Sequence, residues 1–89
     1  GESDELLRFA KALADKTRVQ ILFALKDASL YAQDVVSLTG LTAATVSHHM
    51  SELASTGLVS LEKQGTRILY RLLPSKIERL IGLLKSLTT

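Results

Sequence analysis

The chain of 89 residues lacks cysteine and tryptophan, and it has one proline, two phenylalanines and two tyrosines. Without cysteine it cannot form a disulfide, a thiolate zinc site or a redox-active thiol pair. The sequence contains no run of about 18 apolar residues, so we expect no membrane-spanning helix and no membrane partner. Because aromatic residues are scarce, the core is expected to be mainly aliphatic.

Hydrophobic residues make up 46% of the sequence, and the net charge is +2. The hydrophobic share is typical of a folded domain, and the length fits a single domain over residues 1–89. The opening segment GESDELLRF is acidic and lacks the layout of a signal peptide, so we expect a cytoplasmic protein. Lys63, Arg67 and Arg71 form a basic strip without an intervening acid. That strip suits an anionic partner, although a solvated hairpin explains it equally well.

Helical spacing of apolar residues predicts two helices at the start of the chain. The first runs from about Asp4 to Leu13 with Ser3 as its N-cap, and the second runs from about Lys16 to Lys26. The buried face of the second helix is expected to contain four residues: Val19, Leu22, Phe23 and Leu25. A short extended segment over residues 30–32 is expected to follow.

A helix-turn-helix is predicted in the middle of the chain. The short helix over residues 33–39 should end at Gly40, because glycine adopts the left-handed conformation without strain. Thr42 is a suitable N-cap for the next helix, which we expect over residues 43–56. Two helices joined by a turn that contains glycine are typical of this motif.

Two β-rich segments around KQGT predict a hairpin with Gly65 at its tip. Pro74 should end the second strand, and SKIE, Ser75 to Glu78, predicts a capping box at the start of a last helix. The predicted fold is therefore mainly α with a small β-hairpin wing. It is a winged helix-turn-helix with additional N- and C-terminal helices.

The spacing of Val46, Met50 and Leu53 predicts which face of the 43–56 helix is buried. The opposite face then exposes small or compact hydrogen-bonding residues, which can approach the floor of the DNA major groove closely. We therefore expect this helix to bind DNA. The predicted contact residues in and before it are Thr42, Ala43, Ala44, Thr45, Ser47, His48 and His49.

The adjacent histidines His48 and His49 are the only two in the chain. Neighbouring side chains on a helix diverge by about 100°, so the pair is poorly placed to bind one metal ion. No arrangement of residues resembles a catalytic triad or a paired-carboxylate site, so we expect neither an enzyme nor catalytic residues. His48 is predicted to contact DNA. For His49, a structural or phosphate-facing role is as well supported as a base contact.

The first and last helices carry more apolar surface than one small core needs. Leu83 and Leu84 diverge by about 100° and cannot both face that core. We therefore expect a two-fold homodimer, with Gly82 allowing another helix to approach closely. The predicted interface residues are Leu6, Leu7, Ala10, Ile77, Leu80, Ile81, Leu84 and Leu87.

Two segments, LADKTRVQIL (residues 13–22) and TVSHHMSELASTGLVSLEKQGTRILYRL (residues 45–72), resemble the ArsR/SmtB family of bacterial winged-helix repressors. Lys16 stands where the family typically has proline. The resemblance implies a homodimer that binds an inverted-repeat operator in double-stranded DNA and blocks transcription. The 43–56 helix would enter the major groove, and the 62–67 wing would lie along the backbone or minor groove. Implied wing and backbone contacts are Thr17, Arg18, Lys63, Gln64, Gly65, Thr66 and Arg67.

The sequence departs from the family at its metal-sensing positions. Arsenic-sensing members carry Cys-x-Cys where this chain has Tyr31 and Gln33, and zinc-sensing members use Asp and His of the last helix. Here the last helix lacks histidine, and Glu78 is its one acid. A carboxylate-only site from Asp4, Glu5 and Glu78 is conceivable, but we predict no metal and no other cofactor. The inducer stays open, and a small molecule at the dimer interface is one option.

Two functions from different classes fit these observations. The first is a homodimeric, sequence-specific transcriptional regulator, most simply a repressor. The alternative is a winged-helix module that binds a protein partner and has no specific DNA binding. Ala43 and Ala44 slightly weaken the first hypothesis, whereas the cations of the wing weaken the second.

Overall fold

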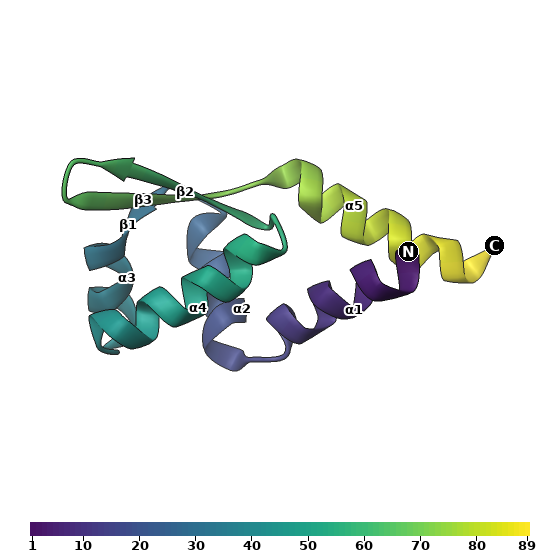
Figure 1. Cartoon of the computed structure of the whole chain (residues 1–89), viewed down its shortest axis with the longest axis horizontal. Coiled ribbons are helices and arrows are strands. Elements are labelled where there is room, and N and C mark those ends of the chain that lie inside the picture. The colour runs from purple at the N-terminus through teal and green to yellow at the C-terminus, as the bar shows by residue number, and fades with distance from the viewer.

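The computed structural model describes all residues from 1 to 89, and its element order confirms the predicted winged helix-turn-helix (Figure 1). Five α-helices and three strands follow one another along the chain, and the last helix continues into a short 3₁₀ turn. The elements are α1 Glu2–Leu13, α2 Lys16–Leu25, β1 Leu30–Tyr31, α3 Ala32–Thr39, α4 Ala43–Ser55, β2 Val59–Gln64, β3 Arg67–Leu72, α5 Pro74–Lys85 and η1 Ser86–Thr88.

The helix-turn-helix consists of α3, a short turn and α4, as predicted. Gly40 ends α3 in the left-handed conformation with φ of 70°. The Thr42 hydroxyl accepts a hydrogen bond of 3.2 Å from the Thr45 backbone N–H, and this bond caps α4. Val46, Met50 and Leu53 are all buried, so the predicted inward face of α4 is confirmed.

The wing is an antiparallel hairpin of β2 and β3, and its turn uses Gly65 with φ of 65°. The predicted extended segment is also confirmed, because β1 pairs with β3 and makes the sheet three-stranded, in the order β1-β3-β2. Tyr31 on β1 lies opposite Leu69. This pairing fixes the hairpin to the body of the domain beside α3.

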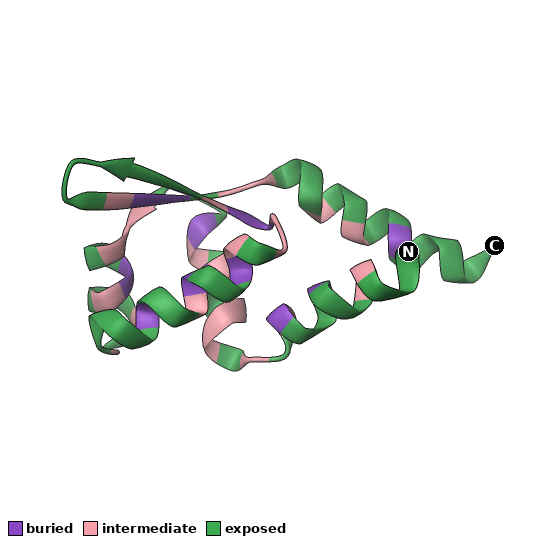
Figure 2. Ribbon diagram, viewed as in Figure 1, coloured by how far each residue is buried: buried purple, intermediate pink, exposed green.

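One aliphatic cluster with two aromatic members forms the core (Figure 2). The prediction for α2 was correct at Leu25, which is buried, but wrong at Phe23, which is 67% exposed, and it missed the buried Ile21. Apolar residues lie on nearly all sides of α2, so periodicity alone does not select its inner face. The buried cluster is Phe9, Ala12, Ile21, Leu25, Val35, Val46, Met50, Leu53, Leu58, Val59, Tyr70 and Leu83.

Two predicted helix caps are also corrected. Ser3 does not cap α1, because the helix already begins at Glu2 after Gly1. The capping box at Ser75 does not form, because α5 begins one residue earlier, at Pro74, and its N-cap makes no side-chain hydrogen bond. Proline is favoured at the first helical position, since its fixed φ suits the helix and its missing N–H is not needed there.

The molecule is elongated, with extents of 45 × 22 × 21 Å. Figure 1 shows α1 and α5 side by side at one end, and an ion pair joins Arg79 to Glu5 there at 2.7 Å. Leu83 is the buried residue of α5, whereas Leu7, Ile81 and Leu84 are about half exposed in this single chain. No helix is long and apolar enough to cross a membrane.

Candidate nucleic-acid interface

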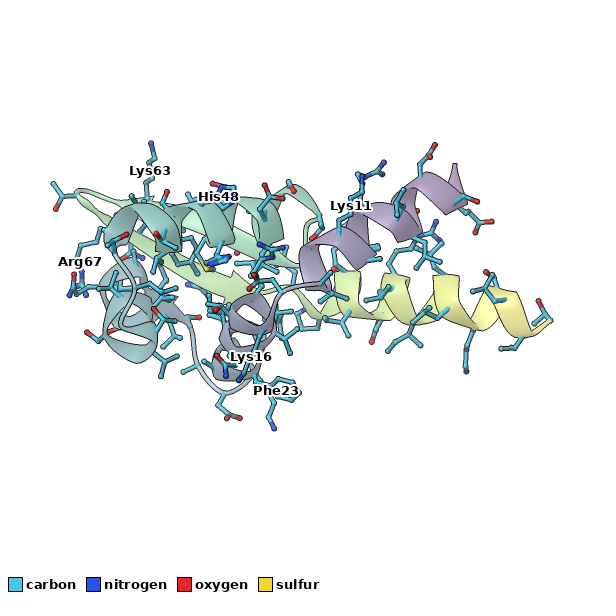
Figure 3. All side chains as sticks on the ribbon, turned by 90° about the horizontal axis from the view of Figure 1, so that it is seen from below. Lys11, Lys16, Phe23, His48, Lys63 and Arg67 are labelled. Carbon is cyan, nitrogen blue, oxygen red and sulfur yellow. The ribbon has the colours of Figure 1, made fainter.

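The outer face of α4 carries short side chains. Because Val46, Met50 and Leu53 point into the core, the residues between them other than His49 point outward. Figure 3 shows His48 on this outer side of the helix. All exposed residues of the first three turns except Glu52 have short side chains, and these are Ala43, Ala44, Thr45, Ser47, His48 and Ser51. We call this set the α4 face.

Thr42 precedes the α4 face and already has a local role. Its hydroxyl accepts the Thr45 N–H and donates to the Thr45 hydroxyl oxygen at 2.9 Å. The hydroxyl is therefore committed to the cap, while the free N–H groups of the first turn stay at the surface. A helix N-terminus of this kind favours phosphate, because its N–H groups and the positive end of its dipole point outward.

The two histidines lie in different environments. His48 is exposed, whereas the side chain of His49 is only 12% exposed, and their ring centroids are 6.1 Å apart. No group of three His, Asp or Glu residues in the molecule is arranged to hold a metal ion. In particular, Glu5, which was considered for a carboxylate site, is bonded by both carboxylate oxygens to Arg79.

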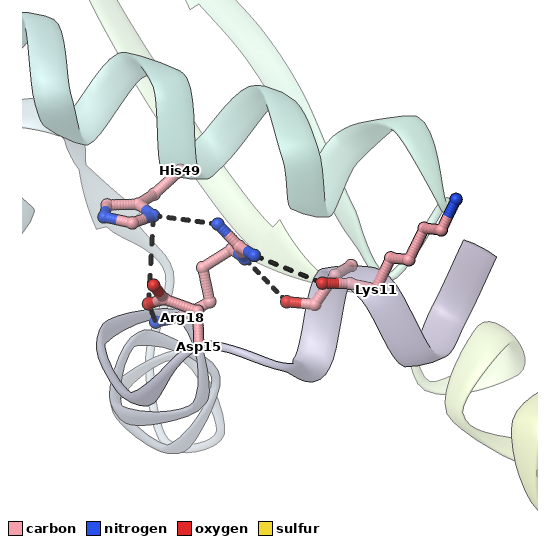
Figure 4. A network of polar contacts seen from close by, with 5 residues as sticks. Lys11, Asp15, Arg18 and His49 are labelled. Atoms are coloured by element: carbon pink, nitrogen blue, oxygen red, sulfur yellow. Dashed lines mark hydrogen bonds and ion pairs between the residues drawn. The ribbon is translucent and has the colours of Figure 1, made fainter. Parts of the chain in front are cut away.

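His49 belongs to a polar network beneath α4 (Figure 4). Its Nδ1 lies 3.2 Å from Nη1 of Arg18 and 4.0 Å from Oδ1 of Asp15. Asp15 also caps α2 by accepting the Arg18 backbone N–H at 3.0 Å. That hydrogen bond is the main cause of the lowered pKa of the Asp15 carboxyl. Of the roles considered for His49, this geometry favours the structural one.

Arg18 occupies a different place from the one its predicted phosphate contact requires. Its Nε donates to the Ala12 carbonyl at 2.6 Å and its Nη2 donates to the Lys11 carbonyl at 3.2 Å. With Nη1 at His49, all three guanidinium nitrogens have partners within the chain. Arg18 therefore links α1, α2 and α4, and its guanidinium is directed toward these partners rather than toward an external phosphate. Its neighbour Thr17 is half-buried at the start of α2.

The wing is held to the body of the domain by Tyr31. The Tyr31 hydroxyl donates to Oε1 of Gln64 at 2.8 Å, and the Arg67 guanidinium stacks over the Tyr31 ring at 3.5 Å from its centroid. Stacking of this type orients the cation while leaving its edges free. The wing residues Lys63, Gln64, Gly65, Thr66 and Arg67 are all exposed.

The three cations of the basic strip are not equivalent. Arg71 is paired with Glu62 at 3.7 Å, and Arg67 is stacked on Tyr31. Lys63 makes no ion pair and no side-chain hydrogen bond within the chain. Lys63 is therefore the wing cation with the most freedom to meet an external anion.

Sequence reasoning missed one cation beside the α4 face. Figure 3 shows Lys11 of α1 on the same side of the molecule as His48 and Lys63, whereas Lys16 and Phe23 project on the opposite side. Lys11 is exposed and makes no ion pair. The α1 sequence identifies an apolar face, but it does not show which of its exposed residues lie beside α4. That assignment requires the tertiary arrangement.

An apolar groove lies away from the α4 face. It has a volume of about 380 Å³ and includes the exposed ring of Phe23, which points away from His48. It contains no acid and no histidine, so it offers no acid–base chemistry and belongs to neither the wing nor α4. Its lining residues are Leu13, Val19, Leu22, Phe23, Lys26, Leu72 and Ile77.

Known proteins resemble the chain in sequence. Residues 15–60 match a family described as "Bacterial regulatory protein, arsR family". The HTH-type transcriptional regulator CmtR of Mycobacterium tuberculosis is 40% identical over 77 residues, which are 86% of this chain and 65% of CmtR. The chain thus spans less than two thirds of the length of this relative. The transcriptional activator HlyU of Vibrio cholerae is 32% identical over 77 residues, covering 86% of this chain and 71% of HlyU.

Solved structures agree with the observed fold. The structure of HlyU from Vibrio cholerae superposes with a TM-score of 0.77 at 30% identity, over 96% of this chain and 92% of that one. The homodimeric winged helix-turn-helix DNA-binding domain of a possible ArsR-family regulator from Mycobacterium bovis is 33% identical, with a TM-score of 0.77. That match covers 96% of this chain and 79% of the Mycobacterium bovis chain.

Proposed function

The chain belongs to the arsR family of bacterial regulatory proteins, and on this basis we propose that it is a homodimeric, sequence-specific DNA-binding transcriptional regulator. One observation carries the proposal. Apart from Glu52, the residues that α4 leaves at the surface are small or compact hydrogen bonders, whereas its large apolar residues are buried. A helix with such a surface fits the major groove, where hydroxyls and an imidazole can bond base edges.

Direct base contacts are assigned to Thr45, Ser47 and His48. Ala43 and Ala44, at the start of the helix, can approach thymine methyl groups or the sugar-phosphate backbone without steric conflict. Thr42 contributes indirectly, because its cap fixes the first turn. We assign His49 a supporting role, since its ring is largely buried under the helix.

Positions on either side of α4 are proposed to meet the DNA backbone. The wing over residues 62–67 would lie along the backbone or in the minor groove, with Lys63 and Arg67 as its cations and Gln64, Gly65 and Thr66 at its tip. Lys11 would contact phosphate on the other side of α4, and the start of α2 at Thr17 lies between α1 and the helix-turn-helix. Contacts to phosphate position a protein on the duplex without reading sequence.

A second copy of the chain completes the proposed regulator. Two α4 helices related by a two-fold axis read an inverted repeat whose half-sites are separated by about one turn of DNA or a multiple of it. The exposed apolar residues of α1 and α5 support this arrangement, because they would be covered in a dimer. The homodimeric neighbour from Mycobacterium bovis supports it as well.

We propose repression as the outcome of binding, because a dimer seated on an inverted repeat blocks access to the DNA beneath it. Activation is the second candidate, since the relative HlyU is named a transcriptional activator. Reporter expression with and without the gene distinguishes the two outcomes, because loss of a repressor raises expression whereas loss of an activator lowers it. A regulator of this kind acts on the bacterial chromosome, so the proposed location of the protein is the cytoplasm.

Selection of bound sequences from random DNA tests the proposal. We expect an inverted repeat to be enriched and to bind roughly 10³-fold or more tightly than random DNA at physiological salt. If the selected and random sequences bind equally, the regulator proposal is wrong. The protein-interaction module would then be the better description of this fold.

A further inference from the structure

Arg18 lies at the junction of three helices, and its guanidinium joins two of them. Two of its nitrogens donate to the last turn of α1, at Ala12 and Lys11, and the third contacts His49 in the middle of α4. His49 is the residue directly after His48, which we assign to base reading. We call the group formed by Arg18, His49 and the two α1 carbonyls the Arg18 brace.

The α1 side of the brace is well suited to a guanidinium. The last carbonyls of a helix lack partners within the helix, and they carry the negative end of its dipole. Arg18 Nε meets the Ala12 carbonyl at 2.6 Å, so this charge satisfies an otherwise free acceptor. Guanidinium is planar and presents donors in fixed directions, which fixes the angle between its partners as well as their distance.

The α4 side of the brace requires a particular form of His49. Arginine can only donate, so Nδ1 of His49 must be the acceptor, with the ring hydrogen on Nε2. Asp15 lies 4.0 Å from the same nitrogen and holds the Arg18 backbone through the α2 cap. The side chain of His49 is 12% exposed, so the contact is shielded from bulk water.

We propose that Arg18 is a positioning residue that sets the angle between α1 and α4 and thereby fixes the half-site spacing that the dimer accepts. This inference rests on the proposed function, because it assigns α1 to the dimer and α4 to the groove. A chain that pairs through α1 and α5 transmits that geometry to α4 through the shared apolar core and through the contacts of α1 with α2 and α4. The Arg18 brace is the polar contact that spans them.

The distinguishing measurement is spacer preference. A residue that only stabilises the fold changes the affinity for all spacings by the same factor when it is replaced. A residue that fixes the angle of α4 changes the ratio between affinities for the preferred spacer and for spacers one base pair longer or shorter. This ratio is measured with the full chain on the selected inverted repeat, next to thermal melts and sedimentation of each variant.

Matched substitutions isolate the brace. Arg18→Ala and His49→Leu each remove one side of it, and we expect roughly 2- to 30-fold weaker binding at the preferred spacer with little change at the altered spacers. His49→Asn places a carbonyl oxygen near the position of Nδ1 and should retain most of the preference. Lys16→Ala is the control, because Lys16 is exposed on α2 and makes no ion pair or side-chain hydrogen bond.

The outcomes separate this inference from the proposed function. If the unsubstituted chain shows no preferred sequence, both are wrong. If it prefers one spacer, and folded, dimeric Arg18→Ala and His49→Leu variants keep the same ratio between spacers, only the brace is wrong. His49→Leu covers the case in which Arg18→Ala does not fold, because leucine fills a similar space while removing the acceptor.

Discussion

The two ends of this molecule differ in the side chains that they expose. At the end formed by α4 and the wing, most exposed side chains are short, polar or cationic, as at Ser47, His48 and Lys63, and Leu61 is the one large apolar residue exposed there. At the end formed by α1 and α5, they are large and aliphatic, as at Leu7 and Ile81. The first surface suits a hydrated polyanion, and the second suits a copy of itself, because large exposed apolar patches are otherwise unfavourable in water.

The interior behind each surface explains the difference. Helix α4 has 13 residues and buries its three large apolar side chains in the core of the single chain, so it leaves no large apolar side chain exposed. Helix α5 is of similar length, with 12 residues, but buries only Leu83. Fully burying an exposed leucine or isoleucine contributes about 1.5–3 kcal/mol, so covering the exposed half of Ile81 or Leu84 would contribute about half of that. A helix that leaves so much apolar area exposed would be stabilised by a second copy, as the proposed dimer requires.

The largest effect is expected when a charge is placed on the aliphatic end formed by α1 and α5, because this change tests whether that end forms the dimer interface. We expect Leu84→Glu to convert the dimer to a monomer, because Leu84 is 49% exposed in the single chain and lies on the predicted interface. DNA affinity should fall by roughly 10²-fold or more, since the second half-site no longer binds in the same event. Sedimentation and gel-shift titration measure the two effects.

Phe23→Glu is the matched control for that experiment. Phe23 is even more exposed than Leu84, at 67%, and it is not among the predicted interface residues, although the groove that it lines shares Ile77 with them. The substitution should leave the dimer intact. Equal dissociation by Phe23→Glu would show that the groove, and not the α1–α5 end, carries the interface.

A second substitution tests the proposed base contacts at the end formed by α4 and the wing. We expect His48→Ala to weaken operator binding by about 1–3 kcal/mol and to relax sequence choice at one position of each half-site, because it removes a base-edge contact. Its affinity for random DNA should change little. Repeating the sequence selection with the variant measures this. A loss of the same size on every sequence would remove His48 from the base contacts and assign it to the backbone.

How far the sequence predicted these surfaces depends on how distinct each local pattern is. In α4 the apolar residues Val46, Met50 and Leu53 are separated by polar or small ones, so one period fits and the inner face was predicted correctly. In α2 apolar residues surround the helix, and Phe23 was assigned to the wrong side. There the neighbours in space, and not the spacing, decide which residues are buried.

In the candidate site, too, the residues that a local pattern exposes were predictable, and those that depend on tertiary packing were not. Exposure of Thr45, Ser47 and His48 follows from the α4 pattern alone, so these residues were identifiable before the structure. The role of Arg18 was not, because its partners lie six, seven and 31 residues away in the sequence. Lys11 was missed for a similar reason, since its place beside α4 depends on how α1 packs.

A smaller effect is expected from removing a single cation of the wing. We expect Lys63→Ala to weaken binding to all sequences about equally and to reduce the slope of log K against log salt by about one, because one phosphate contact is lost. Lys16→Ala, on the opposite side of the molecule, should change neither quantity. Fluorescence anisotropy at several salt concentrations measures both. A change confined to one base position would contradict the backbone assignment of the wing.

The smallest expected effect concerns two carboxylates in acid, Glu5 at the end formed by α1 and α5 and Asp15 in the network beneath α4. Hydrogen bonds from Arg79 lower the pKa of Glu5 below its ordinary value of 4.5, and the backbone N–H of Arg18 lowers the pKa of Asp15 below 3.8. A lowered pKa stabilises the folded state above the ordinary value, and this contribution disappears as the pH falls through the folded-state pKa.

Urea unfolding of Glu5→Gln and Asp15→Ala from pH 7 to pH 2.5 tests this comparison. Both variants should be less stable than the unsubstituted chain at pH 7. The ionic contribution to each difference should begin to shrink below about pH 4.5 for Glu5 and only below about pH 3.8 for Asp15, because a more acidic group keeps its charge longer. For Glu5→Gln, a difference that stays constant down to pH 2.5 would mean that the Arg79 pair contributes packing rather than charge, and that the aliphatic end is stabilised without it.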